Sequence, residues 1–93
     1  MVNAIILIQT KYGKINDVAE SLAEIPEISE VYSVGGSFDV IAIIRVRDNE
    51  DIADLVTRKM LDVDGIERTE TMIAFKAYSR HDLEAVFSIG PGN

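Results

Sequence analysis

Cysteine is absent from this chain of 93 residues, and His81 is its single histidine. The absence of cysteine excludes disulfide bonds, thiolate metal sites and cysteine nucleophiles. A lone histidine needs carboxylate partners to hold a metal ion, and neither a His-x-x-x-His nor a Glu-x-x-His spacing occurs. A small domain without disulfide bonds or a structural metal ion is stabilised by packing or by assembly. We expect no metal and no cofactor.

Basic residues are few, because 9 Lys and Arg stand against 16 Asp and Glu and the formal net charge is −7. Nucleic-acid binding draws most of its affinity from contacts between basic side chains and phosphates, and the basic residues here form no run. The composition therefore argues against direct DNA or RNA binding. It argues equally against attachment to an anionic membrane surface.

Long hydrophobic runs are also missing. The longest fully apolar run is about five residues, whereas a membrane-spanning helix needs about 20. The N-terminus has no basic region before its apolar run and no cleavage-like site, so it does not predict a signal peptide. We expect a cytoplasmic protein. The length predicts one domain, and one core leaves no residues for a separate DNA-binding module.

Hydrophobic periodicity predicts alternating strands and helices. Residues 2–10, 31–34, 38–47 and 67–78 are strand-like runs, whereas 15–25 and 52–60 place apolar residues at helical spacing. Pro26 ends the first helix, Asp48 or Asn49 caps the second, and residues 82–87 favour one or two further helical turns before a loose tail. The order βαββαβ, with a weak repeat at a shift of 38 residues, predicts an α+β, ferredoxin-like fold with a four-stranded antiparallel sheet and two helices on one face.

The two strands expected at the centre of the sheet are apolar on both alternations. One alternation packs on the helices, and the other lies on the opposite face. That second set is one of two: Ile5, Leu7, Ile41 and Ile43, or Ile6, Ile8, Val40 and Ile44. A soluble monomer rarely leaves such a patch exposed to water. We expect a second copy to cover this face, and the alternative is that the C-terminal segment folds over it.

The segment Gly35-Gly36-Ser37-Phe38-Asp39 lies between two predicted strands. Its simplest interpretation is a tight hairpin turn whose glycines adopt positive φ. The functional alternative is that the glycines let a ligand approach backbone N–H groups while Asp39 supplies a carboxylate. Such groups match the carboxylate and the ammonium of a zwitterion. From the residues alone, both interpretations stay open.

No arrangement of residues indicates catalysis. The serines lack the context of a nucleophile elbow, and Gly35-Gly36 leads into a strand rather than into the Lys-Ser/Thr pair and helix of a phosphate loop. Asp62 and Asp64 are more typical of a solvated turn than of a calcium loop or a catalytic dyad. His81 is more typical of a solvated residue or a helix cap than of a metal ligand. We expect a protein that is not an enzyme.

Two motifs resemble the effector domain of the Lrp/AsnC family, which is also called the RAM domain. Residues 31–40, VYSVGGSFDV, resemble the family's valine-x-x-valine-threonine-glycine-x-tyrosine-aspartate signature. Residues 63–71, VDGIERTET, resemble its glycine-valine-x-x-threonine-x-threonine entry into the last strand. The resemblance covers residues 1–78 and leaves 79–93 as a C-terminal extension. Gly35 replaces the usual threonine and Phe38 the commoner tyrosine.

The resemblance implies a domain that dimerises through its sheets, assembles further into octamers or related rings, and binds amino acids in clefts between subunits. The chain starts at the first strand of the effector domain, so it resembles the stand-alone form. Carried over by position, the resemblance implies ligand contacts from eight residues: Tyr32, Gly35, Gly36, Ser37, Phe38, Asp39, Thr69 and Thr71. Asp39 would hold the ligand ammonium or fix the turn, and the two threonines would line the cleft.

We therefore predict a non-catalytic module that binds an amino acid or a similar small metabolite, oligomerises, and regulates transcription or amino-acid metabolism. One alternative is a structural partner that co-assembles with full-length Lrp/AsnC regulators without sensing a ligand. Another is an enzyme of the dimeric α+β barrel type, which shares the topology but usually needs a polar residue inside the barrel. The candidates for that residue lie toward strand ends: Gln9, Arg45 and Lys76.

Overall fold

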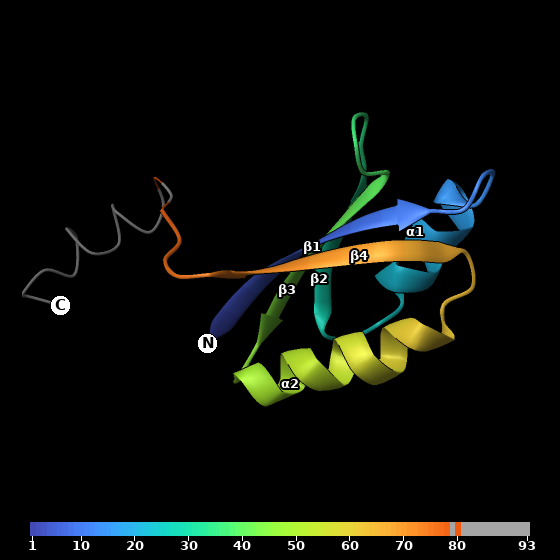
Figure 1. Cartoon of the computed structure of the whole chain (residues 1–93). Helices are drawn as coiled ribbons and strands as arrows, with labels where there is room; N and C mark the ends of the chain where they lie inside the picture. The colour runs from blue at the N-terminus through green and yellow to red at the C-terminus, as the bar shows by residue number, and fades with distance from the viewer. Residues whose placement is uncertain (79, 81–93) are drawn as a thin grey trace, which may run out of the picture.

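The computed structural model describes residues 1–78 and 80. Along the chain lie β1 (Val2–Thr10), α1 (Ile15–Ala23), β2 (Ile28–Ser33), β3 (Val40–Val46), α2 (Asn49–Asp54), the π-helical turn η1 (Leu55–Lys59), the 3₁₀ turn η2 (Met60–Asp62) and β4 (Ile66–Ala74). The strands form one antiparallel sheet in the order β2-β3-β1-β4. Both helices cover the same face of this sheet (Figure 1). The predicted ferredoxin-like fold is confirmed.

The central strands β1 and β3 alternate between buried and half-buried residues. Ile6 pairs with Ala42 and Ile8 with Val40, and all four are fully buried against the helices. Directly paired residues point to the same side of a sheet. The remaining alternation therefore lies on the face that no helix covers, hereafter the open face, and consists of the first predicted set: Ile5, Leu7, Ile41 and Ile43.

Strand boundaries differ from the prediction by two or more residues at three places. β2 begins at Ile28 rather than at residue 31, and β3 begins at Val40 because Phe38 and Asp39 belong to the preceding loop. β4 ends at Ala74 rather than at residue 78. The reason is that Ala74 pairs with Asn3, at the start of β1, so no partner strand continues beyond it. The predicted turns at 82–87, the tail and His81 lie outside the described residues.

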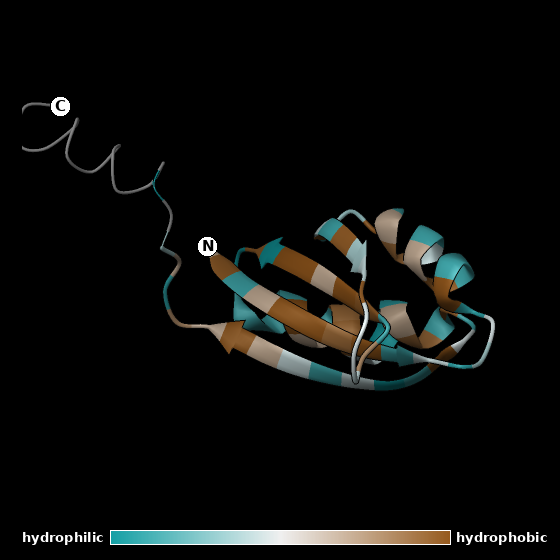
Figure 2. Ribbon diagram, turned by 90° about the horizontal axis from the view of Figure 1, so that it is seen from above, coloured by the Kyte–Doolittle hydropathy of each residue, from teal (hydrophilic) through white to brown (hydrophobic). Residues whose placement is uncertain are grey.

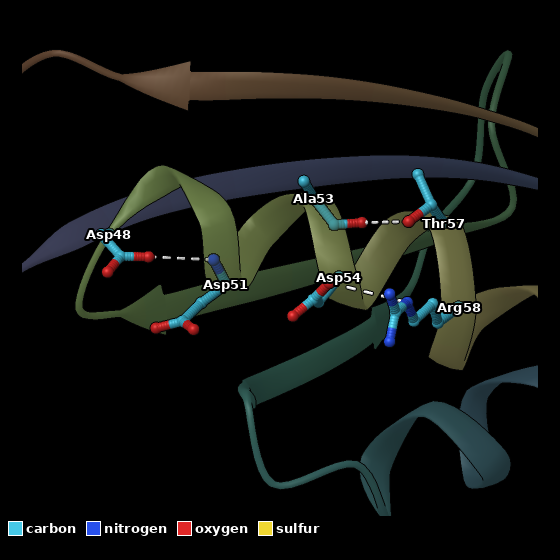
Figure 3. A network of polar contacts seen from close by, with 6 residues as sticks. All are labelled: Asp48, Asp51, Ala53, Asp54, Thr57 and Arg58. Atoms are coloured by element: carbon cyan, nitrogen blue, oxygen red, sulfur yellow. Dashed lines mark hydrogen bonds and ion pairs between the residues drawn. The ribbon is translucent and has the colours of Figure 1, made fainter.

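The second predicted helix is divided into α2, η1 and η2, and Figure 3 shows its polar contacts. The side chain of Asp48 accepts a hydrogen bond from the backbone N–H of Asp51 at 3.0 Å, so Asp48 is the predicted cap. Where α2 continues into η1, the hydroxyl of Thr57 donates to the carbonyl oxygen of Ala53 at 2.6 Å. In the part of the chain that the structure describes, no helix is long and apolar enough to cross a membrane.

An ion pair joins η1 to the loop before β2. The Lys59 ammonium donates to both carboxylate oxygens of Glu27, at 2.7 and 2.6 Å, and this contact lowers the pKa of Glu27 below its ordinary value. Because the folded-state pKa is the lower one, the pair contributes stability above the unfolded pKa, about 4.3. That contribution is lost as the pH falls through the folded value.

We expect acidification from pH 7 to about 3 to destabilise the wild-type protein more than Glu27→Gln, because the variant has no carboxylate to protonate. The difference is about 0.5 kcal/mol, since solvent screens a pair this close to the surface. Thermal unfolding of both proteins at the two pH values measures it. Equal losses in both proteins would show that the pair contributes nothing to folding.

Candidate functional site

The loop between β2 and β3 holds five of the eight predicted ligand contacts and extends beyond the sheet (Figure 1). The backbone N–H of Val34 donates to the carbonyl oxygen of Asp39 at 2.9 Å and closes the loop. This loop is longer than the tight turn expected. Gly36 has a φ of 128°, and Gly35 does not share that positive φ. A β-carbon at Gly35 meets nothing within 4 Å, so sterics do not explain why the usual threonine is missing.

The two glycines form a matched pair for mutation. We expect Gly36→Ala to lower the free energy of unfolding by about 1–2 kcal/mol, because its φ is strained for any residue with a β-carbon. Gly35→Ala should leave stability unchanged or raise it by about 0.5 kcal/mol through the unfolded chain. Urea unfolding of both variants measures the difference. Equal midpoints would contradict the loop conformation.

Asp39 ties this loop to the end of β1. Its Oδ2 atom accepts hydrogen bonds from the backbone N–H of Thr10 at 2.9 Å and from the Thr10 hydroxyl at 3.2 Å. Its own N–H donates to the carbonyl oxygen of Ile8 at 2.9 Å. Oδ1 has no hydrogen bond to any residue that the structure describes. Oδ2 of the carboxylate therefore holds the loop, and Oδ1 is available to accept a hydrogen bond from a ligand.

Asp39 also lines a hollow of about 360 Å³ at the turn between β1 and α1. This volume is within the range of small-molecule sites. The other lining residues supply an ammonium, a phenol ring, a hydroxyl and aliphatic surface: Thr10, Lys11, Tyr12, Gly13 and Ile15. The hollow therefore offers charges of both signs next to a fixed carboxylate.

Phe38, which precedes Asp39 in the loop, contacts a residue of β4. The guanidinium carbon of Arg68 lies 5.2 Å from the centroid of the Phe38 ring. Arg68 pairs with Gln9, which lies on the open face because its neighbours Ile8 and Thr10 are buried on the other one. The Arg68 side chain therefore reaches across β1 to the loop. The sequence alone does not indicate Arg68 or Thr10, because only strand register and loop position bring them here.

Tyr32 lies on the open face, since it pairs directly with Ile41. Its hydroxyl donates to the carboxylate of Glu30 at 2.7 Å, and this contact raises the pKa of the phenol. Tyr32 is exposed and is not part of the hollow beside Asp39. It belongs to the rim of the aliphatic patch on the open face.

Thr69 and Thr71 lie on the opposite face of the sheet. They pair with Ile8 and Ile6, which are buried under the helices. Thr69 lines a second hollow, of about 220 Å³, between η1, η2 and the start of β4. One chain therefore does not bring all eight predicted residues together, and a cleft built from all of them needs more than one copy.

A sheet with one open aliphatic face and a loop that presents a fixed carboxylate defines a small ligand-binding domain. Residues 3–83 match the model of the Lrp/AsnC ligand binding domain, and the chain belongs to this family. It is 37% identical over 75 residues to the HTH-type transcriptional regulator FL11 of Pyrococcus horikoshii, a match that covers 81% of this chain and 49% of the regulator. The chain thus spans about half the length of the curated relatives it matches.

Solved structures show the same fold. TTHA0845 from Thermus thermophilus is 42% identical with a TM-score of 0.80, over 86% of this chain and 100% of that one. The transcriptional regulator NMB0573 of Neisseria meningitidis, solved as a complex with L-Met, has a TM-score of 0.76 over 85% of this chain and 53% of that one. Its identity of 18% supports the fold alone.

Proposed function

We propose that this domain binds a free amino acid or a similar small metabolite at the loop of residues 35–39, as a non-catalytic module that regulates transcription or amino-acid metabolism. The observation that carries the proposal is the geometry of Asp39. Its Oδ2 atom is held by Thr10, so its position does not depend on a ligand. Its Oδ1 atom accepts the charge-assisted hydrogen bond of an ammonium group.

The backbone of the same loop supports the proposal. The N–H groups of residues 35–38 make no backbone hydrogen bond within the described part of the chain, and residues 35–37 are exposed. These donors are suited to an anionic group. The loop and Asp39 therefore offer both kinds of contact that a zwitterion needs, within one segment that β1 holds in place.

We infer further that the module works as an assembly, with a second copy on the open face. Figure 2 shows apolar residues continuing along the central strands. On the outer strands the patch is bordered by Tyr32 and Met72, which are 48% and 45% exposed. Full burial of an exposed large aliphatic side chain contributes about 1.5–3 kcal/mol, and these half-buried residues would gain part of that. Assembly also supports the ligand site, because Tyr32 and the threonines of β4 lie on opposite faces of one chain's sheet.

The open face gives little support to catalysis. Of the polar candidates, Gln9 and Arg45 lie near the ends of β1 and β3, and Lys76 lies beyond β4. Between them the two central strands are aliphatic, and Glu70 of β4 lies on the same face beside Leu7. An exposed carboxylate on an outer strand, which no ion pair of the described residues includes, is weak support for a catalytic centre.

Thermal unfolding with each of the twenty amino acids at millimolar concentration tests the proposed function, on protein whose oligomeric mass is known. A ligand at 100 times its dissociation constant stabilises the folded state by about 2.7 kcal/mol. For a domain of this size the unfolding temperature rises by about ten degrees. A rise confined to a few amino acids is the expected result. No rise with any of them would exclude an amino-acid sensor and favour structural co-assembly.

A further inference from the structure

The end of β4 and the residues after it concentrate exposed apolar side chains. Met72 and Ile73 are nearly half exposed, Tyr78 is largely exposed and Phe75 is fully exposed. These are four of the large hydrophobic residues that the described structure exposes, and all lie within residues 72–78. Soluble proteins rarely leave such a concentration in contact with water. A strand-like segment with one charge and no proline is also an aggregation hazard when it stays exposed, so this segment marks a contact surface.

Residues 75–78, hereafter the arm, extend beyond the sheet. The last pair between β1 and β4 joins Asn3 to Ala74, and Figure 1 shows the chain running past the start of β1 from there. The N–H groups of the arm make no backbone hydrogen bond within the described part of the chain. The ammonium of Lys76 lies 5.3 Å from the centroid of the Tyr78 ring. The backbone and the aromatic rings of the arm are therefore available for a contact.

The arm is continuous with the open face. Met72 pairs with Ile5 of the aliphatic patch, and Ala74 pairs with Asn3, two residues from Ile5 and thus on the same side of β1. The strand that borders the patch therefore leads directly into the arm. A partner that covers the patch lies next to the arm as well.

The charge of this segment favours a second copy of the chain as that partner. No acidic residue occurs between residues 71 and 81, whereas Lys76 and Arg80 are basic. The rest of the chain carries all 16 acidic residues, and the net charge is −7. Two such chains repel each other overall, but a basic segment of one is attracted to the acidic surface of the other.

We propose that the arm of each chain packs against the second copy that covers the open face. The inference rests on the assembly proposed above, and it names a segment beyond the sheet that stabilises this assembly. Phe75 is the main contact, because its ring is fully exposed in one chain and buried aromatic rings contribute strongly to interfaces. Tyr78 adds a second ring, and Lys76 brings a positive charge to an acidic partner.

Sedimentation of the full chain over a range of concentrations tests the contact. We expect Phe75→Ala to raise the dissociation constant of the dimer by at least about 30-fold, because each dimer loses two buried rings. Tyr78→Ala should raise it by about tenfold. Leu61→Ala is the matched control, because it removes an exposed side chain from η2, and it should leave the dissociation constant unchanged. Full exposure of Phe75 in one chain means that Phe75→Ala should not disturb folding.

Fluorescence shows which chain covers the arm. The chain contains no tryptophan, so Phe75→Trp introduces a single reporter. We expect its emission to lie at short wavelengths in the dimer and to shift to long wavelengths when Ile43→Lys separates the copies. Leu61→Trp should emit at long wavelengths with and without Ile43→Lys.

The outcomes separate this inference from the proposed assembly. A monomeric wild type would remove both together. A dimer whose dissociation constant is unchanged by Phe75→Ala and by Tyr78→Ala would remove the inference alone. Short-wavelength emission from Phe75→Trp that persists with Ile43→Lys would show that residues of the same chain cover the arm. Long-wavelength emission in the dimer would show that the second copy leaves the arm in water.

Discussion

Asp39→Ala is expected to lower the free energy of unfolding by about 3 kcal/mol, a large loss for a surface loop. The substitution removes the acceptor of two hydrogen bonds from Thr10, and Thr10 is only 8% exposed. A hydrogen bond to a charged group contributes about 1.5–3 kcal/mol, and a buried N–H left without a partner costs a similar amount. Urea unfolding measures the loss. An unchanged midpoint would show that the contact with Thr10 does not hold the loop.

Asp39→Asn separates folding from binding at the same position. The amide oxygen still accepts both hydrogen bonds from Thr10, so the loss of stability should fall to about 1 kcal/mol. The negative charge that an ammonium group requires is gone, and the response to amino acids should weaken by at least tenfold. Asp62→Asn, at an exposed site of η2, is the matched control. A full amino-acid response in Asp39→Asn would exclude Asp39 as the ammonium contact.

The two faces of the sheet illustrate how far the sequence predicts the fold. Alternation identifies β1 and β3 as the central strands, because they are apolar on both sides. It cannot choose the buried side for the same reason, since Ile5 and Ile6 are equally apolar. The choice follows from helix packing, in which residues such as Val18 and Leu22 contact one alternation only. This information is spread over distant parts of the chain.

Part of the candidate ligand site is likewise predictable from the sequence, and part of it is not. The motif in residues 31–40 predicts the loop and Asp39 without any structure, because glycines and an aspartate between two strands are a local pattern. Thr10, which holds Asp39, lies 29 residues away in sequence, and Arg68 follows the loop only after β3, the second helical segment and the start of β4. The Thr10–Asp39 contact depends on which residue of β1 lies beside the loop. The Arg68–Phe38 contact depends in addition on how β4 pairs with β1. A local sequence pattern does not specify how distant strands pair.

The open face carries the second large prediction: Ile43→Lys should convert a dimer into a monomer. Ile43 lies within the aliphatic patch, beside Ile5 on one side and Glu30 on the other. In one chain a lysine there remains hydrated, so the fold should persist. Between two sheets its ammonium would lose water at a cost of several kcal/mol, and Glu30 beside it, which already accepts the Tyr32 hydroxyl, would offset only part of that cost. The dissociation constant should therefore rise by at least 100-fold.

Sedimentation at micromolar concentration measures this change, with the wild type expected at twice or more the 10.3 kDa of one chain. Leu61→Lys is the matched control, because Leu61 is 76% exposed in η2, among the helices on the other side of the sheet. A monomeric wild type, or an Ile43→Lys protein with the wild-type mass, would exclude a second copy on the open face.

The same pair of variants decides whether assembly builds the ligand site. Tyr32 and the threonines of β4 lie on opposite faces of one chain's sheet, so a cleft built from both needs a second copy and should lose its ligand when the subunits separate. Ile43→Lys should then fail to respond to amino acids, whereas Leu61→Lys should respond fully. A monomeric Ile43→Lys that still binds would place the whole site within one chain, at Asp39 and the hollow beside it. Binding and assembly would then be independent properties of this domain.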